Sequence, residues 1–190
     1  LSAVATAFLL LSIVLIFGVT GSLKLGDIAR TFSSGDLKFV IGLCTGFFIF
    51  GFGLKAALVP FHSWLPDAHP SAPAPISAML SGLLIKVSGV YALTRLFLNV
   101  FGLTPALSTV LMYLGIISIL VGALIALGQN DIKRMLAYSS ISQVGYIVLG
   151  IGAGTNFAIM GALFHILNHA LAKGLLFLNS GSIEHSTGTR

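Results

Sequence analysis

Six stretches of mostly apolar residues follow one another along the 190-residue chain, separated by short polar segments. A helix needs roughly 20 such residues to cross a bilayer, so each stretch is a candidate membrane-spanning helix. The candidates are residues 1–19, 37–59, 75–98, 105–127, 133–152 and 156–180. Barrel strands are excluded, because the stretches show no period-2 alternation and exceed the roughly 10 residues of such a strand. We predict an all-α, polytopic membrane helix bundle of about six helices.

The composition excludes a soluble domain. Hydrophobic residues make up 56% of the chain and charged residues 8%, whereas soluble domains carry about 25% charged residues. The formal charge of +5 is too dispersed to predict a nucleic-acid partner. Cys44 is the single cysteine, which excludes an internal disulfide or a multi-cysteine cluster. We expect a single transmembrane module over residues 1–190, in contact with the lipid bilayer and holding no cofactor and no metal.

Two lysines within the apolar stretches are candidates for function. Lys86 lies at the middle of its stretch, where a charge costs about 2.5 to 3.5 kcal/mol on insertion scales. Lys55 lies near the end of its stretch, shortly before Pro60. Proline disrupts the preceding helical turn, so we expect a broken helix near Lys55 to Pro60, of the kind that lines cavities in membranes. Snorkelling to the membrane surface is the alternative reading, and it is stronger for Lys55 than for Lys86.

The last stretch carries a row of three protonatable groups. His165, His169 and Lys173 are spaced i, i+4, i+8, so they share one helix face over about 12 Å. Histidine exchanges protons near neutral pH, because its unperturbed pKa is about 6.5. The alternative for each histidine is a hydrogen-bonded core residue. We favour a proton relay for the row.

A second polar face is predicted on the preceding stretch. It comprises Ser139, Ser142, Gln143 and Tyr146, spaced i, i+3, i+4, i+7. We expect this face to point into the bundle. Interhelical hydrogen bonding and the lining of a hydrated path explain it equally well.

The acidic residues all fall in predicted loops or at the ends of stretches. They are Asp27, Asp36, Asp67, Asp131 and Glu184. Cations buried in a membrane usually have a partner. The lysines are therefore neutral for part of their cycle, or their carboxylate lies on a segment outside this sequence, and we expect the chain to be part of a larger subunit.

Three segments carry a resemblance to a known family. They are KAALVPFHSWLPDAH from Lys55 to His69, followed by Ser71-Ala-Pro; DIKRMLAYSSIS from Asp131; and HILNHALAKGLLF from His165. Together with Lys86 in LLIKV, they resemble the antiporter-like subunits of respiratory complex I. The same module is shared with Mrp-type Na+/H+ antiporters and membrane-bound hydrogenases. The likeness spans nearly the whole chain.

The resemblance implies a subunit built from two inverted five-helix repeats, of which this chain supplies the middle helices. It identifies Lys55 with the family lysine on the first broken helix and Lys86 with the connecting lysine. His165, His169 and Lys173 would link to the second half-channel. The glutamate partner of Lys55 would precede Leu1. The segment from Pro66 to His69, with Lys133 and Arg134, would face the cytoplasm or matrix.

The expected function is proton translocation through intramembrane Lys and His, as a multi-pass subunit of a redox-driven NADH:quinone oxidoreductase. The membrane would be a bacterial or archaeal cytoplasmic membrane or the inner mitochondrial membrane, and the partners other membrane subunits and H+ or Na+. We expect no catalytic redox site here. An Mrp antiporter or hydrogenase subunit, a passive anion or metabolite transporter and a structural scaffold are the alternatives.

Overall fold

The computed structural model describes residues 1–33 and 38–188, and its regular elements are all helical. In chain order they are α1 (Ser2–Thr20), α2 (Leu25–Ser33), α3 (Lys38–Ala56), α4 (Leu65–Ser71), α5 (Ala74–Met79), the π-helical η1 (Leu80–Tyr91), α6 (Ala92–Leu96), the π-helical η2 (Phe97–Phe101), α7 (Pro105–Leu127), α8 (Ile132–Ala153) and α9 (Asn156–Thr187). Six helical segments are long and apolar enough to cross a membrane, with α5 to η2 acting as one. The predicted all-α bundle is confirmed.

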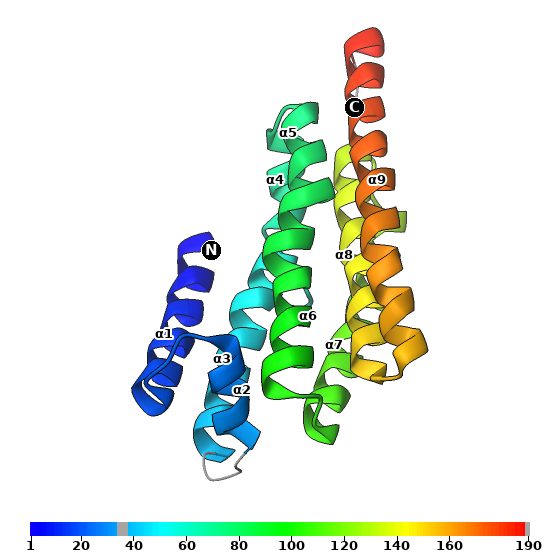
Figure 1. Cartoon of the computed structure of the whole chain (residues 1–190). Coiled ribbons are helices and arrows are strands. Elements are labelled where there is room, and N and C mark those ends of the chain that lie inside the picture. Colours follow the sequence, from blue (N-terminus) through cyan, green and yellow to red (C-terminus); the bar gives the residue numbers. More distant parts are fainter. Residues whose placement is uncertain (34–37, 189–190) are drawn as a thin grey trace.

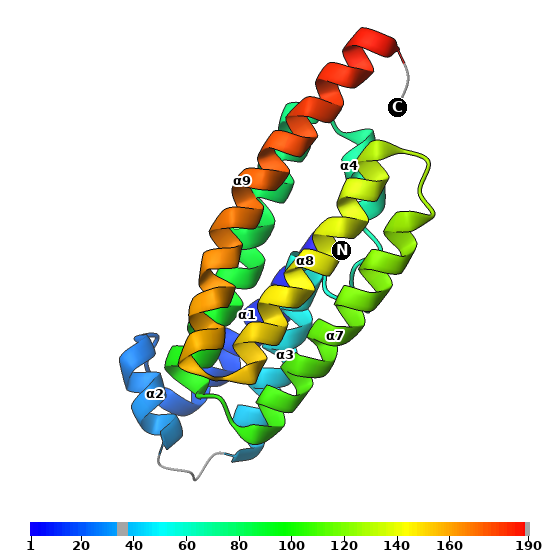
Figure 2. The same cartoon turned by 90° about the vertical axis from the view of Figure 1, so that its right-hand side faces the viewer.

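The bundle has two groups of helices joined by a central one. Helices α1 and α3 pack together at one side, and α7, α8 and α9 lie at the other (Figure 1). The run from α5 to η2 stands between them and contacts both α3 and α9. Seen from the side in Figure 2, α8 lies between α7 and α9. Helix α8 is consequently the most enclosed of the six spans, with 61% of its apolar window buried.

Several boundaries differ from the predicted ones. The second stretch was expected to begin at residue 37, which lies outside the described residues, and its helix ends at Ala56 rather than at residue 59. The loops expected over 21–36 and 60–73 contain the short helices α2 and α4. Helix α9 runs through Gly181 to Thr187 instead of ending at residue 180, and Gly188 caps it in the left-handed conformation (φ 68°).

The predicted helix break is present and follows directly after Lys55. Helix α3 stops where Ala57 adopts a left-handed backbone conformation, with φ 56°, which costs a residue with a side chain about 1 to 2 kcal/mol. The N–H of Leu58 donates to the carbonyl of Gly53 at 2.9 Å, as in a Schellman helix end. The indole of Trp64 donates to a further carbonyl at that end, at 2.8 Å. These hydrogen bonds satisfy carbonyls that the break frees.

Glycines permit very close contact between α7 and α8. A Cβ atom added at any of four glycines would lie within 3.0 Å of the facing helix; these are Gly115, Gly122, Gly145 and Gly152. At Gly122 it would lie 2.6 Å from the backbone nitrogen of Ser142. The G-x-x-x-G pair Gly42 and Gly46 has no such neighbour among the described residues. Small residues thus join helices in this bundle, although not at the motif that is easiest to find in the sequence.

Candidate functional site

Lys86 is buried within the bundle. Its side chain lies on the π-helical stretch η1 and is only 2% exposed. The ammonium donates a hydrogen bond to the carbonyl of Ser81, five residues earlier on the same helix. This position excludes snorkelling for Lys86 within the described chain, because the amine reaches an interior carbonyl and not a polar surface. Helical stretches with π geometry are frequent at functional sites.

A pair of buried serines lies between Lys86 and α9. The hydroxyls of Ser81 on η1 and Ser140 on α8 are 3.1 Å apart, and Ser140 donates to the carbonyl of Leu136 at 2.9 Å. The same carbonyl accepts a hydrogen bond from the ammonium of Lys173 at 2.8 Å. Two buried amines are thereby linked through a short polar strip that crosses from η1 through α8 to α9.

The predicted row on α9 faces this strip. Lys173 and His169 are 4% exposed, and His165 is half-buried. The rings of His165 and His169 stack with their centroids 5.9 Å apart, and His165 Nε2 lies 2.7 Å from Gln143 Oε1. Neither ring nitrogen of His169 has a hydrogen-bond partner in the described structure. A row of titratable groups, one of them with free nitrogens, can pass protons if water reaches it.

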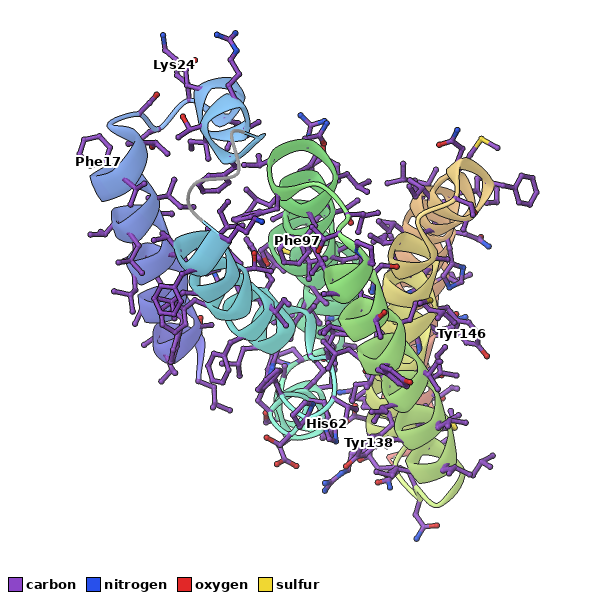
Figure 3. The ribbon with its side chains drawn as sticks, turned by 90° about the horizontal axis from the view of Figure 1, so that it is seen from below. Phe17, Lys24, His62, Phe97, Tyr138 and Tyr146 are labelled. Atoms are coloured by element: carbon purple, nitrogen blue, oxygen red, sulfur yellow. The ribbon has the colours of Figure 1, made fainter. Side chains whose placement is uncertain are left out.

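The second predicted polar face is only partly directed into the bundle. Ser139 accepts a hydrogen bond from Lys173, and Gln143 contacts the α9 row as described above. Ser142 is buried against α7 at Gly122. Tyr146 is 50% exposed and points outward from α8 (Figure 3). At Tyr146 the face is only half covered: the ring meets that of His165 edge-on, with centroids 6.4 Å apart, and the rest of the side chain is exposed.

Lys55 occupies a separate place from the polar strip. It is half-buried and lines a cavity of about 350 Å³, together with Leu1, Ser2, Ala5, Leu54, Trp64, Leu80, Leu84, Ile85 and Ser88. No ion pair of Lys55 occurs among the described residues. Lys86 does not line this cavity. The structure places Lys55 against the helix that carries Lys86 but does not bring the two ammonium groups into contact.

Charged residues meet at one end of the bundle. Arg134 pairs with Asp67 at 3.1 Å, and Lys133 pairs with Glu184 at 2.9 Å. Lys133 also donates to the carbonyl of Ala72 at 3.3 Å. These contacts bring the segment after the helix break to the same end as the start of α8, as the resemblance implied. Near this end, the rings of His62 and Tyr138 lie 6.5 Å apart (Figure 3).

His69 is buried at this end, on α4. Its ring stacks on that of Phe177 with centroids 4.3 Å apart, and neither ring nitrogen has a partner in the described structure. Burial first, and then the positive charges of Lys173, Lys86 and Lys133, together lower the pKa of His69 from 6.5 to about 4. The imidazole is therefore neutral at pH 7.

The whole of this arrangement falls inside one known module. The family described as "NADH:quinone oxidoreductase/Mrp antiporter, TM" matches the chain over residues 1–190. The chain belongs to this family. The resemblance carried by the Lys55, Asp131 and His165 segments is confirmed, and with its six apolar helices this member of the family is an integral, multi-pass membrane protein.

Relatives of the antiporter family cover nearly all of the chain. NADH-quinone oxidoreductase subunit N of Desulforudis audaxviator (strain MP104C) is 42% identical over 189 residues, 98% of this chain and 38% of the relative. A chain of the Mrp complex from Dietzia sp. DQ12-45-1b superposes with a TM-score of 0.91 at 32% identity, covering 100% of this chain and 35% of its own. A chain of respiratory complex I from Thermus thermophilus superposes with a TM-score of 0.86 at 27% identity, and the match covers 99% of this chain and 40% of the Thermus chain. The present chain thus spans less than half the length of these relatives.

Some residues of this antiporter-family site are not predicted by the sequence. Ser81 lies five residues before Lys86, and only a π-helical turn brings these two positions together. Ser140 is outside the predicted polar face, although it adjoins Ser139. His69 stands in the segment that carries the resemblance, but nothing in the sequence shows that its ring meets α9.

Proposed function

We propose that this chain is the part of an antiporter-like membrane subunit that moves protons across the bilayer through buried lysines and histidines. Lys86 and Lys173 exchange protons through the strip between them, and His169 and His165 continue the path along α9. Redox chemistry in partner membrane subunits drives the movement by changing the charge near these groups. The subunit acts as part of a translocase.

The polar strip between the two lysines is the observation that supports this proposal. Burial of two amines and two hydroxyls is costly in a membrane, and such groups are retained where they serve transport. The hydroxyls of Ser81 and Ser140, 3.1 Å apart, each donate and accept hydrogen bonds. Because the two amines bond the backbone carbonyls of Ser81 and Leu136, the hydroxyls pass a proton between Lys86 and Lys173 through a water molecule at each end, when one amine is neutral and the other is charged.

The kind of polar groups favours H+ as the transported ion. The described interior of the bundle offers amines, imidazoles and hydroxyls, and the acidic residues of the described part lie in loops or near helix ends. Amines and imidazoles take up protons, whereas a bare cation such as Na+ prefers oxygen ligands with negative charge. Na+ is the second candidate ion, because of the similarity to the Mrp complex from Dietzia.

The test uses the full-length protein in its own complex, reconstituted in liposomes. Lys86→Met removes the titratable amine while keeping the length of the side chain, and we expect the initial rate of internal pH change to fall at least tenfold at unchanged yield of assembled complex. Lys24→Met makes the same chemical change at an exposed residue (Figure 3) and should transport normally. Normal transport by Lys86→Met contradicts the proposal.

Ion replacement separates the rival functions. Proton transport that persists with choline in place of Na+ favours H+ alone, and a strict requirement for Na+ favours exchange of the two ions. Flux that depends on chloride and not on pH would indicate a passive anion transporter. Loss of assembly in every Lys86 variant, with normal transport by whatever assembles, would indicate a scaffold.

A further inference from the structure

The row of titratable groups on α9 has a gap. His165, His169 and Lys173 follow one another at intervals of four residues, and the next position on the same face is Phe177. Phe177 is fully buried and has no group that can take up a proton. About two turns further, Glu184 pairs with Lys133. From Lys173 to Glu184 the helix rises roughly 16 Å, which is too far for direct proton transfer.

An imidazole from another helix fills this gap. His69 on α4 lays its ring flat on Phe177, with the centroids 4.3 Å apart and an angle of 22° between the planes. Its hydroxyl neighbour Ser77 bonds the backbone carbonyl of His69 at 3.0 Å and leaves the ring nitrogens untouched. Both nitrogens are buried without a partner in the described structure. Because an unpaired buried polar group is costly, two free nitrogens at this place indicate that water or a passing proton meets them.

The far end of the gap reaches the outside of the bundle. The side chain of Lys133 is 4% exposed, but that of its partner Glu184 is 29% exposed. A carboxylate that is partly in water and bonded to a buried amine can collect a proton from solvent. The charged groups that act on His69 are Lys173 on α9, Lys86 on η1 and Lys133 on α8, so basic groups from three other helices lie near enough to influence the ring.

We propose that His69 is the inlet residue of the path, which passes protons between the Lys133–Glu184 pair at the end of the bundle and Lys173 on α9. This inference rests on the proposed function and adds to it the route by which protons reach the buried lysines. The His69 ring, stacked on Phe177, supplies a titratable group at the position where α9 has none.

Each transfer balances in protons. The neutral imidazole of His69 takes a proton on its bare nitrogen from the side of Glu184, directly or through water. It then releases the proton of its other nitrogen to the neutral amine of Lys173, which becomes an ammonium. The ring is left neutral in its other tautomer, and either a ring flip or a transfer in the opposite direction restores the starting form.

The test measures proton transport by the full-length protein in its complex, with two substitutions at His69. His69→Phe keeps an aromatic ring on Phe177 but has no nitrogen, and His69→Gln keeps hydrogen bonding but cannot relay a proton. We expect both to lower the initial rate at least tenfold with unchanged yield of complex. The matched control is Asp67→Asn, which removes an exposed carboxylate at the same end of the bundle and should keep at least half of the rate.

The alternative is that His69 only fills space against Phe177. That role predicts that His69→Phe transports within twofold of the unsubstituted protein, and this result overturns the proposal. If both His69 variants fail to assemble, Glu184→Gln decides: a tenfold loss supports the inlet, and an unchanged rate overturns it. Lys86→Met is measured in parallel. Normal transport by Lys86→Met refutes the proposed function itself, whereas its loss beside a normal His69→Phe refutes the inlet alone.

Discussion

The hydroxyls of Ser81 and Ser140 lie 3.1 Å apart in a region where neither side chain is more than 1% exposed. They come from two different helices, η1 and α8. Lys86 donates to the backbone carbonyl of Ser81, and Lys173 donates to the same carbonyl as Ser140 does. This contact between the two hydroxyls joins the hydrogen bonds around Lys86 to those around Lys173. It makes the proposed path open to a local test that leaves both amines in place.

Removal of either hydroxyl should interrupt the path. We expect Ser81→Ala and Ser140→Ala each to lower the initial rate of proton transport about tenfold, because each leaves one hydroxyl without its relay partner. The double variant should be no slower than the slower single variant, since both act on one link. The rate is measured by a pH-sensitive dye in proteoliposomes. Ser186→Ala, an exposed serine that bonds its own helix, is the matched control, and equal loss there would contradict the account.

The close packing of α7 and α8 should tolerate no added methyl group. Gly122→Ala would place a Cβ atom 2.6 Å from the backbone nitrogen of Ser142, and overpacking of this kind costs about 1 to 3 kcal/mol. We expect a lower melting temperature of the purified full-length protein. Gly161→Ala on α9 meets nothing within 4 Å and should leave the melting temperature unchanged or raise it, because alanine favours a helix. A similar drop in both variants would contradict the packing.

The sequence predicts the helices well, because membrane spans are specified by length and hydropathy alone. It also places His165, His169 and Lys173 on one face, since that face depends only on the helical period. The helix break after Lys55 follows from Pro60. These features are local, and local physics determines them.

The remaining features depend on contacts between distant segments. The π-helical turn that joins Lys86 to Ser81 has no marker in the sequence, so an α-helical period misplaces the pair. Tyr146 matches a polar face in period but is half exposed beside His165, because α9 covers only part of α8. The stacking of His69 on Phe177 joins residues from α4 and α9. The periodicity of the sequence does not predict such a pair.

The stability of the protein should fall in mild acid because of His69. Its pKa is lowered from 6.5 to about 4 by burial and then by Lys173, Lys86 and Lys133, so between these values the unfolded chain binds a proton that the folded chain does not. The free energy of unfolding therefore decreases as the pH falls, by about 2 kcal/mol between pH 7 and pH 5.

His69→Gln lacks this group and should lose less of its melting temperature between pH 7 and pH 5 than the unsubstituted full-length protein. The exposed His185→Gln is the control and should behave like the unsubstituted protein. An equal loss in His69→Gln and the unsubstituted protein would show that His69 is not buried as a neutral ring.

Glycine should stabilise the protein at the helix break itself and destabilise it one residue earlier, inside the helix. Ala57→Gly removes the steric cost of φ 56° and, after the entropy lost by glycine, should raise stability by about 0.5 to 1 kcal/mol. Ala56→Gly, one residue earlier and within α3, should lower it by about the same amount. The melting temperatures of the two variants should move in opposite directions, and a shift in the same direction would contradict the backbone geometry.

The central claim is that Lys86 must release and regain a proton, and Lys86→Arg tests it most directly. Arginine keeps the positive charge but does not release its proton in proteins, so charge and transport are separated in one substitution. The measurement is the number of protons moved per electron transferred by the full-length protein in its assembled complex. The account predicts assembly with proton movement reduced at least tenfold. A Lys86→Arg complex that moves as many protons per electron as the unsubstituted complex would contradict it.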